Sequence, residues 1–425
     1  MGPKPMVYVT EPILVKEMLA NYYKFAKARG GNPIIRKLMK GVIDAKGDKW
    51  VKHRKIINPA FHVEKLKLIV PAFYTSCNDL VNKWAEMLTK ESSCEVDVCP
   101  YLQTLSNDPI SRTVFGSSFD EGRKIFELQQ EMLELVIKST QSIYIPGSSH
   151  LPIKHNKRVK EINQKVKASI RGIIDSRLVA MKAGKSSNDD LLEILLKSNN
   201  DEIKQESNRN SGLTIEEIIE KCKLFYIVGQ ETTRNLLIWT MILLVTGKNV
   251  LEPTDEVLHI FRDKKPDFEG LNHLKVVSIS IIMKALYLLQ HCSFIYCTNY
   301  CFLGYIHRLG RMVHKENKLG DIMLPAGTLL QVSTIHLHND PEIWGDDVKE
   351  FNPERFSEGV SKLTKGRACY LPFGGGPCIY VGQIFAMLEA KMVFAMILQH
   401  FSFEISPSYL HAPYLVGTLQ PVKEQ

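Results

Sequence analysis

The sequence predicts a mainly α-helical fold with a minor β portion, formed by one domain around a long central helix. Apolar residues recur at positions i, i+3 and i+4 through several long segments, whereas strand-like runs are few and short. No internal repeat divides the 425 residues, although length alone would favour two or three domains. The segment that follows Thr214 is apolar on nearly all sides for about thirty residues, so it belongs in the middle of a large domain.

The elements follow from local patterns along the chain. Helices are expected near 64–90, 121–143, 155–183, 214–246 and 381–400. Thr214 and Glu217 have the spacing of a capping box, which predicts the start of the central helix. The polar stretch 199–211 lacks periodicity and is expected to be a surface loop. Strands are expected at 6–10, 329–337 and 401–405.

The composition is that of an ordinary globular protein, with 44% apolar and 24% charged residues and a formal charge of +8. It excludes a disordered tail, a fibre and a disulfide-stapled miniprotein. Nine cysteines without paired C-x-x-C spacing do not indicate a structural zinc site. His336 and His338 would share a strand face, which we interpret as a polar edge. No interleaving of basic and aromatic residues suggests nucleic acid as a partner.

The chain offers no anchor to a membrane as written. Its first residues lack the apolar core of a signal peptide. The longest apolar run, Leu236 to Val245, is about half of the ~20 residues that a transmembrane helix requires. We therefore expect membrane contact to be peripheral.

A polar group interrupts the apolar central helix at Val228–Thr233. Gly229 weakens a helix, and Glu231 is costly to bury beside the hydroxyl of Thr232. Such a break in a local pattern often marks a functional site. A polar kink satisfied by backbone carbonyls explains it equally well.

A glycine-rich segment, 371–382, opens into the last long helix. The glycines allow close approach of the backbone to a ligand, and the helix N-terminus favours an anion. No G-K-[ST] follows that would indicate a phosphate loop. The segment either presents a thiolate or phenolate to a metal cofactor, or forms a plain turn into the helix.

Together with two further motifs, these features resemble the cytochrome P450 family of haem-thiolate monooxygenases, in particular its plant secologanin-synthase-like group. Trp50 to Arg54 is similar to the family's W-x-x-x-R motif, and 351–356, with Arg355, looks like its PERF segment. The 228–233 segment resembles the oxygen-activation signature, and 373–382 lies where the family has its haem loop. The resemblance covers roughly 3–283 and 311–420.

The resemblance implies a cytochrome P450 fold with haem between the central helix and the helix after the haem loop. It implies that Glu231 and Thr232 act in catalysis by controlling proton delivery to oxygen. Residues expected to contact haem are Trp50, Arg54, Gly229, Phe373, Gly376 and Gly382. The implied reaction is oxidation of a hydrophobic, terpenoid-like small molecule of plant secondary metabolism with O2 and an NADPH-dependent reductase. The implied location is the cytosolic face of the endoplasmic reticulum membrane, or the cytoplasm if the family's N-terminal membrane helix is truly missing.

The sequence departs from the family at the iron ligand. Tyr380 stands where the family has its ligand cysteine, and Cys378 replaces a preceding arginine. A phenolate binds haem iron in catalases but lacks the electron donation of a thiolate. Cys378 lies two residues upstream, up to ~7 Å along an extended chain. We therefore expect Tyr380 at the metal position, with Cys378 as a less suitable substitute.

A second departure replaces the family's ExxR helix. Lys284 to Tyr287 stand at its position, and the longer stretch 284–310 is interpreted as an aberrant insertion of unspliced or frame-shifted sequence. Arg355 would then lose its usual carboxylate, at a cost of several kcal/mol if it stays buried. We expect an impaired monooxygenase. The alternatives are a non-catalytic protein that binds haem or a hydrophobic ligand, or a pseudogene product.

Overall fold

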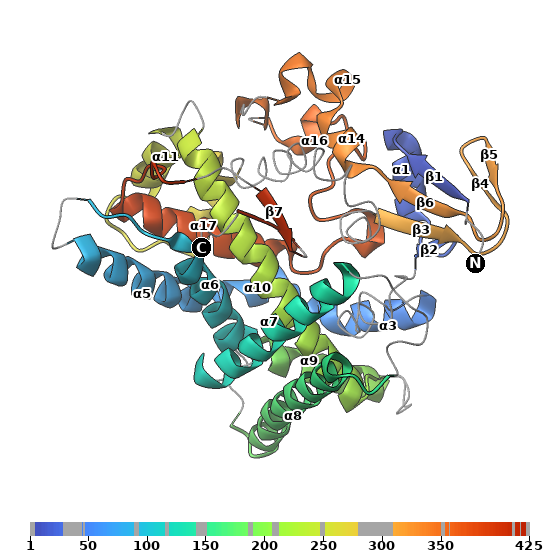
Figure 1. Ribbon diagram of the computed structural model, residues 1–425, viewed down its shortest axis with the longest axis horizontal. Coiled ribbons are helices and arrows are strands. Elements are labelled where there is room, and N and C mark those ends of the chain that lie inside the picture. Colours follow the sequence, from blue (N-terminus) through green and yellow to red (C-terminus); the bar gives the residue numbers. More distant parts are fainter. Residues whose placement is uncertain are drawn as a thin grey trace.

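The computed structural model describes most of the chain, and the described part is mainly helical with small sheets (Figure 1). The described residues are 5–28, 45, 47–88, 93–114, 119–141, 151–185, 190–205, 212–246, 251–278, 309–349, 353–356, 358–409, 413–416 and 418–421. Within them no helix is both long enough and apolar enough to cross a bilayer.

The helices before the central helix are α1 (Pro12–Ala20), α3 (Gly47–Ile57), α4 (Val63–Lys67), α5 (Val70–Leu88), α6 (Val98–Pro109), α7 (Phe119–Gln141), α8 (Lys154–Lys182) and α9 (Leu191–Gln205). The central helix α10 (Ile215–Thr246) is followed by α11 (Leu251–Phe261), α12 (Phe268–His273), α14 (Thr334–Asn339), α15 (Pro341–Trp344), α16 (Val360–Leu363) and α17 (Gln383–His400).

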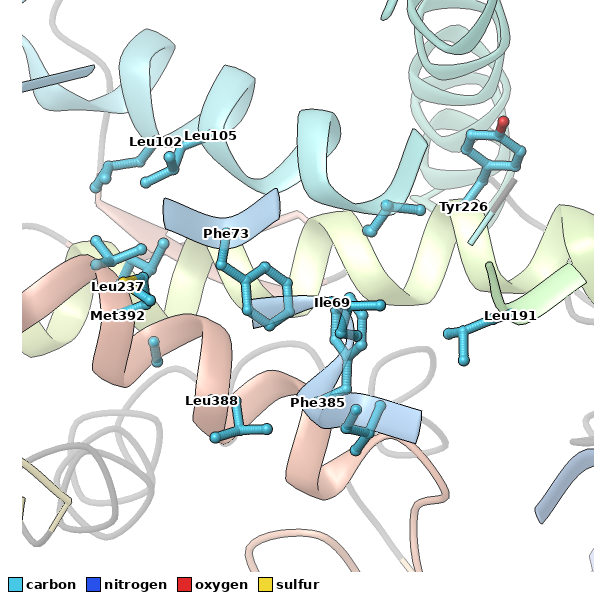
Figure 2. Packing of buried hydrophobic residues seen from close by; sticks show 14 of the residues in the cluster. Ile69, Phe73, Leu102, Leu105, Leu191, Tyr226, Leu237, Phe385, Leu388 and Met392 are labelled. Carbon is cyan, nitrogen blue, oxygen red and sulfur yellow. The ribbon is translucent and has the colours of Figure 1, made fainter. Parts of the chain in front are cut away.

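The central helix α10 lies across the helical part of the molecule and packs against α6, α7, α8 and α17 (Figure 1). Figure 2 shows the core between them, where apolar side chains from α5, α6, α10 and α17 meet. The rings of Phe73 on α5 and Phe385 on α17 pack edge to face with their centroids 5.1 Å apart. Removing one such ring costs about 3–5 kcal/mol of stability, so these contacts fix α17 and the loop that leads into it.

A four-stranded sheet lies beside α1, with strand order β1-β6-β3-β2 (Figure 1). Its strands are β1 (Met6–Val9), β2 (Phe25–Lys27), β3 (Leu309–Val313) and β6 (Leu329–Val332). β1 is parallel to β6, and the other pairs are antiparallel. Two further hairpins are formed by β4 (Asn317–Leu319) with β5 (Ile322–Leu324), and by β7 (Pro413–Val416) with β8 (Thr418–Pro421).

The sequence-based expectations for the helices and for the first strand are confirmed. At the start of α10, Thr214 and Glu217 form the predicted capping box. The Glu217 N–H donates to Thr214 Oγ1 at 3.2 Å, and the Thr214 N–H donates to Glu217 Oε2 at 3.1 Å. These two bonds satisfy N–H groups that the first turn of a helix cannot satisfy internally.

Three local expectations were wrong. The strand expected at 329–337 ends after Val332, because Ser333 caps a new helix by accepting a hydrogen bond from the His336 N–H at 3.4 Å. His336 and His338 therefore lie on α14 and not on a strand. Residues 401–405 form no regular strand.

The polar stretch expected as a loop from 199 is helical as far as Gln205. The reason lies in tertiary contacts of this segment. The Asn199 side chain donates to the carbonyl of Leu213, and Glu202 pairs with Lys55 of α3 at 2.8 Å. Contacts made outside the segment therefore satisfy its polar groups, and residues 206–211 lie outside the described part.

Candidate functional site

One face of α10 is left uncovered. Between Ile218 and Met241 every residue is buried except five, which recur every three or four positions and so share one side of the helix. We call this set the open face: Phe225, Val228, Gly229, Thr232 and Leu236. It is apolar apart from one hydroxyl, so it suits a hydrophobic ligand.

Thr232 is the most exposed residue of the open face. Its Oγ1 donates a hydrogen bond to the Val228 carbonyl at 2.5 Å. Gly229, beside it, allows Ile110 to approach, because a Cβ at this position would lie 2.6 Å from Ile110 Cδ1. The glycine is therefore explained by packing, while the threonine presents its side chain at the uncovered side of the helix.

Glu231 points away from Thr232. It is 6% exposed and accepts hydrogen bonds from Arg234 Nη2 at 3.1 Å and from Asn235 Nδ2 at 3.2 Å. Arg234 also donates to Gln103 of α6 at 2.6 Å. The two residues predicted to act together thus lie on different faces of α10, and the Glu231 carboxylate belongs to the α6–α10 interface. Its role in proton delivery stays a prediction.

Two basic residues face each other across the sheet. Lys27 on β2 and Arg311 on β3 are direct cross-strand partners. Arg311 is 4% exposed, and its Nε has no hydrogen-bond partner. Burial lowers the pKa of both side chains, and the charge of Arg311 lowers the pKa of Lys27 further. Like charges opposite one another are unfavourable in a sheet, so this pair needs an explanation.

Arg54 on α3 completes a cationic cluster, which we define as Lys27, Arg54 and Arg311. The charge of Arg54 also lowers the pKa of Lys27. The Arg54 guanidinium lies 6.0 Å from the centre of the Trp50 ring, and the ring of Tyr22 lies 4.8 Å from that of Trp50. Among the described residues no carboxylate influences the three cations. The cluster is therefore suited to an anionic ligand.

The glycine-rich loop runs past this cluster. At Gly376 the backbone has φ of +66°, and a Cβ there would lie 2.5 Å from the Leu19 carbonyl oxygen of α1. A glycine is required at this point because the loop touches the backbone of α1. Cys378, two residues later, lies on the same side, where its charge raises the pKa of each cation of the cluster.

The other side of the loop holds Tyr380. The Tyr380 N–H donates to the Phe373 carbonyl at 3.0 Å, and the two rings are stacked at 6.2 Å with planes 7° apart. The Tyr380 hydroxyl lies 2.9 Å from where a Cβ of Gly382 would be, at the start of α17. Burial, together with Glu389, raises the pKa of Tyr380 to about 12. The side chain is therefore a neutral phenol packed over Gly382.

His338 secures the beginning of the loop. Its Nε2 accepts a hydrogen bond from the Leu371 N–H at 3.0 Å, and burial lowers the pKa of His338 to about 3, so the ring is neutral. The sequence assigned this residue to a polar edge, but the structure places it between α14 and the loop.

Arg355 pairs with the carboxylate of Asp347. Its Nη2 lies 2.7 Å from both the carbonyl oxygen and Oδ1 of Asp347. The 3₁₀ turn Asp346–Lys349 thus presents Asp347 as an anionic partner, while the loss of the family's usual carboxylate stays a prediction. Of the stretch 284–310, residues 284–308 lie outside the described residues, and Leu309 and Gly310 begin β3.

Sequence analysis did not predict Lys27, Arg311 or Tyr22 as residues of the site. Each is an ordinary residue in a short segment, and the strand pairing that joins Lys27 to Arg311 links distant parts of the chain. No local pattern marks such a pair, because its unusual feature is a contact between like charges on paired strands.

The chain matches the Cytochrome P450 family over residues 1–281 and 304–414. It belongs to the cytochrome P450 family. CYP72A219 of Panax ginseng is 55% identical over 423 residues, which are 99% of this chain and 79% of the relative. The 7-deoxyloganic acid hydroxylase of Catharanthus roseus is 46% identical over 425 residues, which are 99% of this chain and 79% of the relative. The 11-oxo-beta-amyrin 30-oxidase of Glycyrrhiza uralensis is 47% identical over 424 residues, which are 99% of this chain and 77% of the relative.

The mainly helical fold is that of a cytochrome P450, as predicted. The interruption of the family match at 282–303 overlaps the stretch 284–310. That this stretch is an aberrant insertion stays a prediction.

The cytochrome P450 family implies haem as cofactor. Some residues of this chain fit haem, and the residue at the expected iron-ligand position does not. The cationic cluster with Trp50 fits the two carboxylates of haem, and the open face of α10 fits a flat apolar ring. The iron position does not fit. The residue expected at the ligand position is a tyrosine packed against Gly382, in place of a cysteine.

Proposed function

We propose that this chain binds haem together with a hydrophobic, terpenoid-like molecule beside α10, and that it lacks the oxygen chemistry of thiolate-ligated cytochromes P450. The observation that carries the proposal is that Tyr380, packed over Gly382, stands at the expected position of the family's ligand cysteine. In the family, haem supplies O2 activation with electrons from an NADPH-dependent reductase, and electron donation from the thiolate favours O–O cleavage. A tyrosine at this position lacks the electron donation of a thiolate.

The substrate class is supported by the open face and by the relatives. The open face offers apolar contact and the single hydroxyl of Thr232, which suits a large hydrophobic molecule with few polar groups. Two relatives are named for hydroxylation of 7-deoxyloganic acid and for oxidation of 11-oxo-beta-amyrin. We propose a ligand of this terpenoid type, held along α10.

The residues of the site would bind different parts of the ligands. Lys27, Arg54 and Arg311 would bind carboxylates, and Trp50 would pack beside them. Thr232 would hold a water or a ligand hydroxyl at the open face. Glu231 would act on the site through the position of α10, because Arg234 and Asn235 hold its carboxylate.

We extend the family's other properties to this chain as proposals. The reductase would be its redox partner, and its location would be the cytosolic face of the endoplasmic reticulum membrane. Without a thiolate ligand, electrons from the reductase would not lead to oxidation of a substrate. This lack of turnover distinguishes an impaired enzyme from an active one.

The test is the absorption spectrum of the purified, haem-loaded protein after reduction under carbon monoxide. We expect no thiolate-type Soret band, since Tyr380 stands in place of the family's ligand cysteine. A clean band of that type would overturn the proposal. The variant Cys378→Ser serves as the matched check, because a thiolate band that disappears in it would assign the ligand to Cys378.

A further inference from the structure

We infer that Ser406 is a phosphorylation site for a proline-directed protein kinase, and that the phosphate releases the turn 406–409 from Glu95. Ser406 followed by Pro407 is the only serine–proline or threonine–proline pair in the sequence. Proline-directed kinases require such a pair, and proline has no N–H group that the kinase would have to satisfy. None of these residues belongs to the site described above, so the inference does not depend on the proposed function.

The segment around Ser406 is accessible to an enzyme. Residues 401–405 form no regular helix or strand, and the Tyr409 N–H closes the turn by donating to the Ser406 carbonyl at 3.0 Å. Pro407 and Ser408 are exposed, and Ser406 is half-buried. Because a kinase binds its substrate as an extended segment, a short surface turn outside helices and strands needs little rearrangement to bind.

Two serine hydroxyls hold this turn on a single carboxylate. Ser408 Oγ donates to Glu95 Oε1 at 2.6 Å, and Ser406 Oγ donates to the same oxygen. The Ser408 N–H donates to Ser406 Oγ at 3.0 Å. The hydrogen bonds from Ser406 and Ser408 lower the pKa of the Glu95 carboxyl. Since Glu95 precedes α6 and the turn follows α17, these bonds join parts of the chain that are 311 residues apart.

A phosphate on Ser406 is incompatible with this arrangement. Its transfer forms a bond between Ser406 Oγ and the γ-phosphorus of ATP, breaks the bond from that phosphorus to ADP, and releases the hydroxyl proton. The donor to Glu95 is thereby lost, and about 1.5 to 2 negative charges are placed beside its carboxylate. The segments 93–97 and 401–409 contain no lysine or arginine, and their other charged residues are Asp97 and Glu404. Repulsion therefore releases the turn.

Release of the turn would act on the hairpin that follows it. The hairpin begins at Pro413 with β7, and β8 packs against the central helix α10. In the unmodified protein the bonds to Glu95 hold the chain in place shortly before this hairpin. Phosphorylation would remove that anchor, so the hairpin would depend on its contact with α10 alone.

The first test is phosphorylation of the purified full chain by a mitogen-activated protein kinase with ATP, followed by mass spectrometry of its peptides. We expect phosphate on Ser406 in the parent protein and no incorporation in Ser406→Ala. Ser408→Ala is the matched control, because it removes the second hydroxyl bound to Glu95 but keeps the serine–proline pair, and it should still be phosphorylated. Absence of phosphate from Ser406 would overturn the kinase site.

The second test measures release of the turn by hydrogen exchange of the peptide that covers 405–416. Exchange should be about tenfold faster in Ser406→Asp, and in the phosphorylated chain, than in the parent protein. Ser402→Asp, which places the same charge at an exposed position of the same segment, should leave exchange unchanged. Ser406→Ala loses the donor without adding charge, so its increase should be smaller.

A charge reversal separates repulsion from simple loss of a hydrogen bond. Glu95→Lys combined with Ser406→Asp should return exchange to the parent rate, because an ion pair replaces the bonds between the turn and position 95. Equal exchange in Ser406→Asp and Ser406→Ala, or a double variant as fast as Ser406→Asp, would overturn release by charge repulsion.

Discussion

At the scale of single residues, the haem loop is shaped by two glycines and two substituted positions. Gly376 permits contact with α1, and Gly382 leaves space that the Tyr380 ring fills. The Tyr380 ring packs over Gly382 and against Phe373. The backbone of the haem loop is thus held in place while its chemistry has changed.

Gly376→Ala should destabilise the protein more than Gly366→Ala. Both glycines have positive φ, +66° and +69°, so both variants carry the cost of about 1–2 kcal/mol for a left-handed alanine. Only at Gly376 would the new methyl group also meet a backbone oxygen, that of Leu19 at 2.5 Å, since nothing lies within 4 Å of the Cβ position at Gly366. Urea unfolding of both variants measures the difference, and equal losses would refute the proposed contact with α1.

At the scale of elements, α3 and α10 are joined by a buried polar contact. His53 Nδ1 lies 2.9 Å from Lys221 Nζ, and Glu217 lies 3.6 Å from His53 Nε2 and 2.7 Å from Lys49. Burial lowers the pKa of Lys221 from 10.5 to about 8 and that of His53 to about 4. The contact connects the helix that carries Arg54 to the helix that carries Thr232.

Lys221 should make stability rise with pH between about 8 and 10.5. In this window the unfolded chain keeps a proton on Lys221 that the folded chain has lost, so higher pH favours the folded state. The gain is of the order of 2–3 kcal/mol. Urea unfolding from pH 7 to 11 should show this rise in the parent protein and in Lys83→Met, whose lysine is exposed. In Lys221→Met the rise should be absent, and an unchanged slope there would contradict the assignment.

At the scale of the whole molecule, the haem site depends on segments that are far apart in the chain. β2 and β3 supply the cross-strand cations, α3 supplies Arg54 and Trp50, and α10 supplies the open face. The loop before α17 supplies the substituted ligand position. Arg355 is held by Asp347 in place of the family's usual carboxylate. The two proposed defects, at Tyr380 and in the stretch 284–310, lie far apart in the sequence.

Tyr380→Cys alone should not restore full turnover. The variant places a thiol at the predicted ligand position, but it leaves unchanged the stretch 284–310, which we propose replaces the ExxR helix of the family. We expect a partial thiolate-type spectrum under carbon monoxide and little oxidation of a terpenoid substrate with reductase and NADPH. Replacement of 284–310 by an intact ExxR segment in the same variant is the matched comparison. Full turnover by Tyr380→Cys alone would show that the stretch is harmless.

The sequence by itself determined the helical fold, the start of α10 at its capping box and the family of the chain. These features rest on local periodicity and on motifs of fixed spacing, which do not depend on distant contacts. It also predicts that Tyr380 stands at the ligand position. Only the tertiary structure decided that Glu231 turns away from Thr232, that Asp347 pairs with Arg355, and that Lys27 faces Arg311. The free energy of a charged side chain depends on its burial and on its neighbours. Both are decided by which surfaces of the fold meet, so the local sequence does not predict them.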